Sequence, residues 1–193
     1  MGGMALPAVM RFGYGFIQGA DYAAKELGIS GLTVNYYYTG GFSESPEVQS
    51  TAAAWYSDGV EVIFGCGGSL GYSVMKAAEG APDKWVVGVD VDQSNKSERV
   101  IISAAKGLRE SVYQAIDAAY KDEFPGGESW VLGADRDGVS LPMASSKLRS
   151  FSQADYDAIY AKLVAGEIAI KNETAAEDAS ALSTDAVTVT VVK

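Results

Sequence analysis

Three short stretches of the sequence carry the residues that could hold a ligand. "CGGS" (66–69) contains a thiol and two glycines, "DVDQ" (90–93) contains two carboxylates, and "SAAKG" (103–107) contains a lysine. Glycines lack side chains, so a ligand can reach backbone N–H groups there, especially at the start of a helix. An acid and a lysine that face the same space would add charged hydrogen-bonding groups. The candidate binding residues are therefore Gly67, Gly68, Asp90 and Lys106.

Each of these candidates also has an ordinary structural explanation. Gly67 and Gly68 are equally consistent with a tight turn between a strand and a helix. Asp90 fits a solvated loop acid or a helix cap, and Lys106 fits a surface lysine. Side chains alternate along a strand, so Asp92 points away from whatever Asp90 faces, and we interpret Asp92 as structural.

Aromatic residues and the thiol complete the set of chemically interesting side chains. Phe42 lies in a glycine-rich loop after a predicted strand, and it is the candidate for stacking on a flat ligand. The tyrosines at 36–38 are interpreted as sheet packing. Cys66 is expected to pack as a small buried apolar residue, because a thiol without a nearby base is a poor nucleophile.

Composition excludes several classes of function. The chain of 193 residues has no histidine and one cysteine. Histidine metal sites, Ser-His-Asp triads, Cys-His dyads and an internal disulfide are therefore excluded, and no metal or cofactor is expected. A net charge of −10 argues against nucleic acid or an anionic membrane as the partner. No apolar run reaches the roughly 20 residues that span a bilayer, and the first residues lack the pattern of a signal peptide.

Strand and helix patterns alternate along the chain, as in α/β proteins. The segment 129–142 is predicted as two short strands joined at "DRDG", and 172–184 as a linker or surface loop. Helices are predicted over 7–27, 46–57, 69–80, 108–124 and 152–168, and strands over 32–39, 60–66, 84–90, 99–105 and 186–192.

This alternation predicts a parallel, doubly wound sheet with helices on both of its faces. Ligands of such sheets bind outside the carboxyl ends of the strands. The three stretches that could hold a ligand follow the strands at 60–66, 84–90 and 99–105. If these strands are neighbours, we expect the four candidate residues to meet at one rim of the sheet.

A nucleotide cofactor is one ligand that would suit this rim. "GCGGSL" (65–70) begins like the G-x-G-x-x-G fingerprint, although its sixth position is Leu70. Asp90 follows about 20 residues later, where the ribose-binding acid of a Rossmann enzyme belongs. A P-loop sequence is absent. A Rossmann-like enzyme that binds a nucleotide cofactor therefore stays open as the alternative function.

Five motifs, in order, resemble one known family. They are "GGM..PAV..F.YGF..GA", "VIFGCGG", "KWVVGVDVDQ", "ISAAKG" and "DGVSL", and the resemblance runs from Gly2 to about Ile170. The chain is identified on these motifs as a member of the basic membrane protein family, the PnrA-like nucleoside-binding lipoproteins that serve ABC importers. The resemblance implies a type I periplasmic-binding-protein architecture, in which two α/β lobes close on a purine nucleoside.

The resemblance also implies roles for the candidate residues. An acid at the position of Asp90 binds the ribose hydroxyls, and a lysine matched to Lys106 accompanies it. Gly67 and Gly68 line the cleft with backbone, and Phe42 is placed on the base. A ribose 2′,3′-diol offers two O–H donors at a spacing that one carboxylate can accept.

The chain opens where the resemblance places the transition from the first lobe to the second. We therefore expect residues 1–128 to form a ligand-binding lobe, and 129–193 a return segment that would normally join a first lobe that is largely missing. Either the sequence is a piece of a longer protein or it is a one-lobe relative. Apolar surface left by the missing lobe would favour a homo-oligomer.

The function expected is that of the substrate-binding component of an ABC importer, without catalysis. Its partners would be a purine nucleoside and a transporter permease, and its full-length form would be an extracytoplasmic lipoprotein anchored to the cell membrane. A one-lobe interaction module that has lost its ligand is a third possibility.

Overall fold

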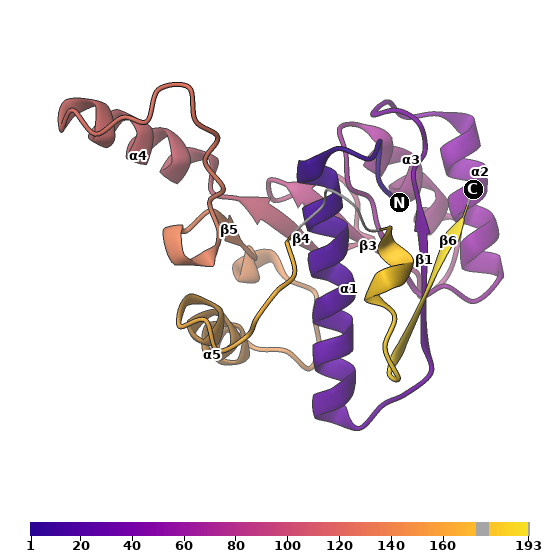
Figure 1. Cartoon of the computed structure of the whole chain (residues 1–193). Helices are drawn as coiled ribbons and strands as arrows, with labels where there is room; N and C mark the ends of the chain where they lie inside the picture. The colour runs from indigo at the N-terminus through magenta and orange to yellow at the C-terminus, as the bar shows by residue number, and fades with distance from the viewer. Residues whose placement is uncertain (173–177, 193) are drawn as a thin grey trace.

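The computed structural model describes residues 1–172 and 178–192 (Figure 1). Helices and strands alternate through the first two thirds of the chain. In order, the elements are α1 (Pro7–Leu27), β1 (Leu32–Tyr37), α2 (Pro46–Ser57), β2 (Val62–Phe64), α3 (Leu70–Glu79), β3 (Trp85–Asp90), β4 (Val100–Lys106), α4 (Leu108–Tyr120), η1 (Ala134–Arg136), β5 (Val139–Ser140), η2 (Met143–Ser145), α5 (Gln153–Val164), η3 (Ala179–Leu182) and β6 (Val187–Val192).

Local sequence signals fix the ends of several helices. Pro7 occupies the first turn of α1, and Gly28 ends it in the left-handed conformation with φ 65°. Ser45 caps α2, because its hydroxyl accepts a hydrogen bond of 3.2 Å from the Val48 N–H. Ser152 and Asp155 form a reciprocal capping box at the start of α5. Each of these boundaries agrees with the sequence prediction.

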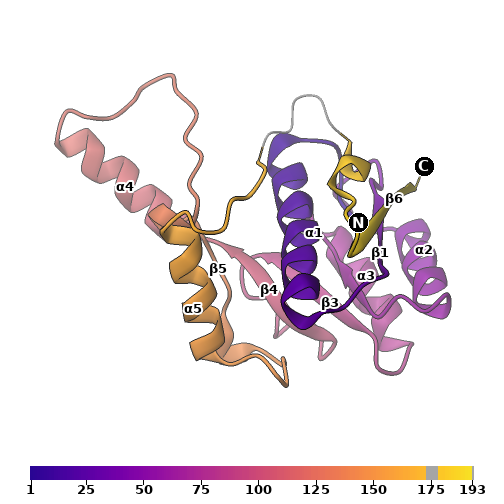
Figure 2. The ribbon, with the colours of Figure 1, turned by 60° about the horizontal axis from the view of Figure 1, so that its bottom comes forward.

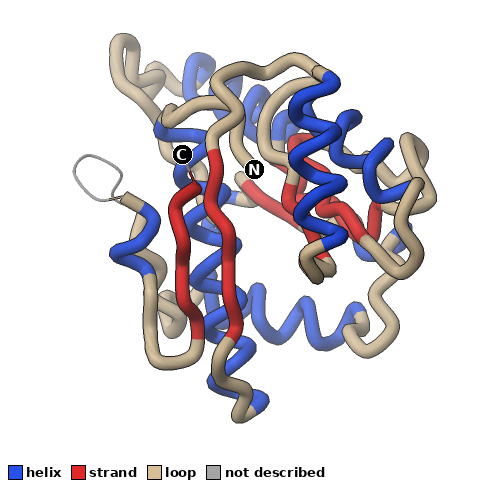
Figure 3. Tube along the Cα trace, turned by 90° about the vertical axis from the view of Figure 1, so that its right-hand side faces the viewer, coloured by secondary structure: helices blue, strands red, loops and turns tan. Residues whose placement is uncertain are grey.

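The strands form two sheets. β2, β3 and β4 are parallel neighbours, and β5 adds to β4 in antiparallel orientation. β1 instead pairs with β6 in a separate parallel sheet, and Figure 3 shows this pair standing apart from the other strands. The α/β class with parallel strands is confirmed. The expectation that segment 32–39 joins the sheet of 60–66 and 84–90 is wrong, because β1 has no ladder with β2; Gly2 lies between them, bridged in parallel to Tyr38 and to Cys66.

Helices cover both faces of the larger sheet, as predicted. Alternate side chains of its parallel strands pack on opposite sides, since a strand directs successive residues to opposite faces. Ile63, Val86 and Val100 belong to one apolar core with α2 and α3. The other face packs against α1 in a core that contains Phe64 and Val87. α1 also covers the smaller sheet, where Ile17 and Val187 are fully buried.

The C-terminal third departs most from the prediction. Segment 129–142 is not a hairpin of two strands: residues 129–133 have no strand structure, a 3₁₀ turn follows, and only Val139–Ser140 pairs, with β4. Segment 172–184 is not only a linker, because η3 buries Leu182 in the core beneath α1; residues 173–177 lie outside the described part. The predicted strand 186–192 is present as β6.

The helix predicted at 108–124 is shorter and projects from the molecule. α4 buries none of its residues, and it extends away from the sheets (Figure 1, Figure 2). Its apolar side chains are therefore exposed, including Tyr113, Ile116 and Tyr120. Among the described residues, no helix is both long and apolar enough to cross a bilayer.

Candidate functional site

The carboxyl ends of three neighbouring strands bring the charged candidates together. β3 lies between β2 and β4, and Asp90 is paired in register with Ala105, one residue before Lys106. The Lys106 Nζ lies 2.5 Å from the Asp90 Oδ1. Both side chains are half-exposed, at 40% for Asp90 and 36% for Lys106. The pair therefore stands at the rim of the sheet, where a ligand can reach it.

The Asp90 carboxylate keeps capacity to accept hydrogen bonds. Its Oδ1 atom is buried, and among the described residues it accepts no hydrogen bond of good geometry. Its contact with Lys106 is an ion pair that lacks such geometry. Lys106 is in turn placed over the ring of Phe12, 5.3 Å from its centroid. Because Oδ1 is buried while the Asp90 side chain is 40% exposed, Oδ2 is the oxygen that a ligand hydroxyl can reach.

The turn after β3 holds Asp90 in an unusual backbone conformation. Asp90 has φ 70°, in the left-handed region that non-glycine residues rarely adopt. Gln93 fixes this turn with two hydrogen bonds. Its side-chain Oε1 accepts from the Val89 N–H at 3.1 Å, and its backbone N–H donates to the Ser103 Oγ at 3.0 Å. Strained backbone held by surrounding contacts occurs often at functional sites.

The absence of a side chain at Gly88 leaves room for the Gln93 and Ser103 side chains that hold this turn. A Cβ atom at Gly88 would lie 2.6 Å from the Ser103 Oγ and 2.7 Å from the Gln93 Oε1. Sequence reasoning did not identify Gln93 or Ser103 as important. Their signal was weak: a glycine inside a strand, and two polar residues that are buried only because β3 and β4 are neighbours.

Asp92 faces different partners from Asp90, as expected, although the cause is the turn that begins at Asp90 and not strand alternation, since β3 ends at Asp90. Its Oδ1 accepts from the Ser94 N–H at 2.9 Å, and its Oδ2 accepts from the Ser145 hydroxyl at 2.7 Å. The hydrogen bond from Ser145, followed by that from Ser94, lowers the pKa of the Asp92 carboxyl. Asp92 thus joins the turn to the 142–145 segment, which is a structural task.

The other three candidates form a second group at the end of β2. The Phe42 ring covers two glycines: a Cβ atom would lie 2.4 Å from the ring at Gly3 and 2.8 Å from it at Gly67. Gly68 has φ 53°, and a Cβ there would approach the Phe42 carbonyl to 2.6 Å. Glycine is required at these positions because the aromatic residue lies directly on the backbone. Cys66 precedes this group and follows β2, the neighbour of the strand that ends at Asp90.

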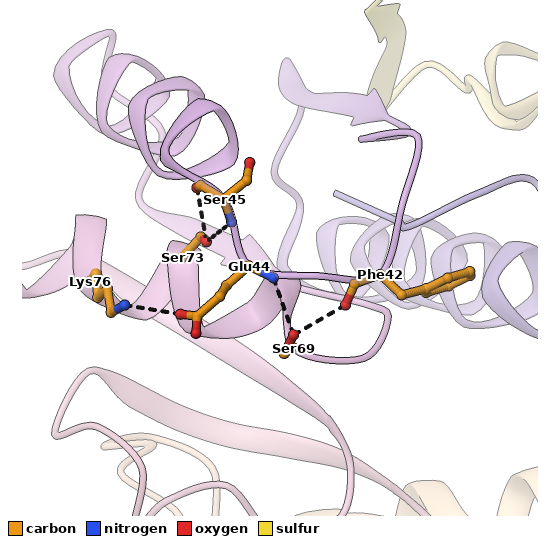
Figure 4. A network of polar contacts seen from close by, with 6 residues as sticks. All are labelled: Phe42, Glu44, Ser45, Ser69, Ser73 and Lys76. Atoms are coloured by element: carbon orange, nitrogen blue, oxygen red, sulfur yellow. Dashed lines mark hydrogen bonds and ion pairs between the residues drawn. The ribbon is translucent and has the colours of Figure 1, made fainter.

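A polar network fixes the Phe42 loop on α3 (Figure 4). Ser73 Oγ accepts from the Ser45 N–H at 2.9 Å and donates to the Ser45 carbonyl at 3.1 Å. Glu44 forms an ion pair of 2.9 Å with Lys76, and its N–H donates to Ser69. In Figure 4 the Phe42 ring points away from these serines.

The same loop occupies the start of α3. The Phe42 carbonyl accepts hydrogen bonds from the Ser69 N–H at 2.8 Å and from the Leu70 N–H at 3.2 Å. Free N–H groups at a helix start are what a phosphate group binds. Since two of them are already used, this geometry disfavours a nucleotide pyrophosphate at "GCGGSL".

Cys66 is buried, and burial raises the pKa of its thiol to about 11. The protonated thiol packs among apolar residues and is a poor nucleophile at neutral pH.

An apolar cavity of about 600 Å³ adjoins Lys106. Phe12 and Phe16 of α1 line one side of it, and residues 130–132 line another. Of the five candidate residues, Lys106 contributes to this cavity.

Known proteins resemble this chain in sequence and in fold. Residues 1–174 match the family described as "ABC transporter substrate-binding protein PnrA-like". Basic membrane protein D of Borreliella burgdorferi is 34% identical over 157 residues, which are 79% of this chain and 44% of that protein. The ABC transporter nucleoside-binding protein BmpA of Lactococcus lactis is 28% identical over 183 residues, 84% of this chain and 51% of that protein.

A solved structure supports the fold. The crystal structure of an ABC transporter system solute-binding protein from Aeropyrum pernix superposes with a TM-score of 0.70 at 22% identity, covering 94% of this chain and 58% of that one. At this identity the likeness shows the type I periplasmic-binding fold alone. The chain spans about half the length of the curated relatives that it matches.

Proposed function

The chain belongs to the PnrA-like family of ABC transporter substrate-binding proteins, and from this membership we propose that it binds a purine nucleoside and releases it unchanged. The relative BmpA of Lactococcus lactis carries nucleoside binding in its name, which supports the ligand class. The observation that carries the proposal is the Asp90–Lys106 pair at the carboxyl ends of adjacent parallel strands, with the Asp90 side chain 40% exposed.

The ribose would be held by the charged pair. The 2′- and 3′-hydroxyls each donate a hydrogen bond, and the accessible Oδ2 of Asp90, which has two lone pairs, would accept both. Lys106 would compensate the negative charge and donate to a sugar oxygen. Charge-assisted hydrogen bonds contribute roughly 1.5–3 kcal/mol each, so this pair can supply much of the affinity for the sugar.

The base would lie toward the end of β2. Phe42 offers an aromatic ring, and Gly67 and Gly68 let Phe42 lie directly on the backbone, which fixes the position of this ring. Phe42 is only partly buried, so part of its side chain is accessible. A flat purine stacked on this ring would leave its sugar toward Asp90, since β2 and β3 are neighbouring strands.

Calorimetric titration tests this proposal. Inosine, adenosine and guanosine should each be titrated, with free ribose and free base as controls, and the recovered ligand should be analysed for chemical change. Asp90→Ala should weaken nucleoside binding by about tenfold or more, because two charged hydrogen bonds are lost. Asp92→Ala is the matched control, since this acid is engaged with Ser94 and Ser145.

Equal losses from the two alanine variants would remove Asp90 from the ribose-binding role. Conversion of the ligand, or binding of a nicotinamide cofactor in place of the nucleoside, would favour the alternative of a Rossmann-like enzyme.

Partners and location follow from the same proposal. The whole protein would deliver its ligand to an ABC transporter permease, as an extracytoplasmic lipoprotein at the cell membrane. Residues 1–128 would form the ligand-binding lobe, and 129–193 would return toward a first lobe. The exposed apolar side of α4 would be covered by that lobe or by another copy of the chain.

A further inference from the structure

Gln93, the last residue of "DVDQ", is a polar side chain buried behind Asp90. It is 9% exposed, and its partner Ser103 on β4 is fully buried. A ligand at the rim of the sheet is held by more exposed groups, so Gln93 is too deep to contact it directly. Buried polar groups with their hydrogen bonds made rigidify the segment that they join. The segment joined here is the turn that carries Asp90.

Asp90 is the central residue of a three-residue turn. The Val91 N–H donates a hydrogen bond of 2.9 Å to the Val89 carbonyl, and Asp90 between them has φ 70°. A hydrogen bond between residues two apart, with a positive φ at the central residue, defines the γ-turn that is rare and strained. Such a conformation persists only where the surrounding structure fixes it.

Gln93 fixes this γ-turn from both of its ends. Before Asp90, the Val89 N–H donates to the Gln93 Oε1 at 3.1 Å. After Asp90, the Gln93 N–H donates to the Ser103 Oγ at 3.0 Å, which joins the chain leaving the turn to β4. Gly88 is paired in register with Ser103, so these polar groups meet where β3 has no side chain. One glutamine therefore holds the residues on either side of Asp90.

The turn also decides which way the Asp90 side chain faces. In a regular strand, residue 90 would share the face of Val86, which packs in the core with α2 and α3. Lys106 alternates with the opposite face, that of Ile102, and its Nζ lies over the Phe12 ring of α1. Regular alternation would thus direct the acid and the lysine to opposite faces, yet the Lys106 Nζ lies 2.5 Å from the Asp90 Oδ1. The left-handed residue lets the pair form.

We infer that Gln93 is the positioning residue of the candidate site. It holds the γ-turn that brings Asp90 to Lys106, and it sets the affinity for a ligand through Asp90 without contacting that ligand. The effect on affinity rests on the proposed function, whereas the effect on the turn does not.

Gln93→Met tests the effect on the turn in the absence of a ligand. Methionine is unbranched and flexible, and its sulfur is a weak acceptor. Because the Val89 N–H loses its partner, its amide hydrogen exchange should become about tenfold faster or more, and the Asp90 backbone chemical shifts should move toward extended values. Ser145→Ala is the matched control, because it removes a hydrogen bond of 2.7 Å to Asp92 in the same loop. It should leave the exchange at Val89 and the shifts of Asp90 unchanged.

A double-mutant cycle with inosine tests the effect on affinity. Gln93→Met should weaken inosine binding about two- to tenfold in the parent chain, the range that one lost hydrogen bond commonly produces. In the Asp90→Ala background the same change should alter affinity by less than about twofold, because the group through which Gln93 acts is gone. A residue that only stabilises the fold would weaken binding by the same factor in both backgrounds.

Unchanged exchange at Val89 and unchanged Asp90 shifts in the Gln93→Met variant would overturn the inference, and so would equal affinity losses in the two backgrounds. If the parent chain binds no nucleoside, the proposed function fails, and the measurements without ligand still decide whether Gln93 holds the turn. If Gln93→Met does not fold, Ser103→Ala takes its place in both measurements. That variant removes the acceptor of the Gln93 N–H, so this amide is then the one that should exchange faster.

Discussion

Substitutions at Asp90 should separate the cost of its backbone conformation from the value of its carboxylate. Asp90 has φ 70°, and a left-handed conformation costs a non-glycine residue roughly 1–2 kcal/mol. Aspartate tolerates this region better than alanine does, and glycine adopts it freely. The ion pair with Lys106 is 36–40% exposed, so it contributes at most about 1 kcal/mol to stability.

These magnitudes predict an order of stability among the variants. Asp90→Gly relieves the strain but loses the ion pair and increases the entropy of the unfolded chain by about 0.5–1 kcal/mol, so its unfolding free energy should stay within about 1 kcal/mol of the parent. Asp90→Ala keeps the strain and also loses the ion pair. The alanine variant should therefore be about 1 kcal/mol less stable than the glycine variant.

Urea unfolding followed by circular dichroism measures this order, and calorimetry measures nucleoside affinity on the same samples. Both variants should lose affinity about equally, because both lack the carboxylate. If the alanine and glycine variants unfold at the same urea concentration, the strain relieved by glycine is no larger than its entropic cost of about 0.5–1 kcal/mol, and the predicted strain at Asp90 is wrong. An affinity loss in alanine alone would show that stability, and not the carboxylate, controls binding.

Three further predictions concern other parts of the chain. Burial lowers the pKa of the Met1 amine to about 6 from an ordinary value of 8.0, so between these values the unfolded chain binds a proton that the folded chain does not. The unfolding free energy should therefore fall by about 2 kcal/mol from pH 8 to pH 6, and acetylation of the amine should abolish this part of the pH dependence. Burial also raises the pKa of the Cys66 thiol to about 11, so iodoacetamide at pH 8 should alkylate it much more slowly in the native protein than in urea, and equal rates would contradict its burial. Finally, Ile116 of α4 is 53% exposed, so Ile116→Lys should leave the urea midpoint nearly unchanged and reduce any self-association measured by light scattering. Lys121→Glu, just after α4, is the control. A large loss of stability in the Ile116→Lys variant would mean that α4 packs on the rest of the chain in solution.

The sequence was sufficient for the local elements and for the order of the rim residues. Helix ends at Pro7, Gly28, Ser45 and Ser152 follow from side-chain chemistry that acts within a few residues. The proximity of Asp90 and Lys106 was also predictable, because carboxyl ends of adjacent parallel strands share one edge of a sheet.

Motif order was a further signal in the sequence itself. Five separate motifs in one order indicated the PnrA-like family, and the family match over residues 1–174 agrees with that resemblance. The prediction of a hairpin at 129–142 was wrong. Its turn residues do form a turn, but local sequence does not show whether the residues on either side find a strand partner, and only Val139–Ser140 pairs, with β4.

Only the tertiary structure decided which strands pair. The same apolar alternation suits β1 whether its neighbour is β2 or β6, so the split between two sheets could not be seen in the pattern of residues 32–37. The burial of Gln93 and Ser103 behind Asp90 likewise depends on β3 and β4 being neighbours. Helix caps and turns depend on contacts within a few residues, which a sequence displays directly. Strand partners and polar anchors depend on contacts between distant segments, and these exist only once the whole chain has folded.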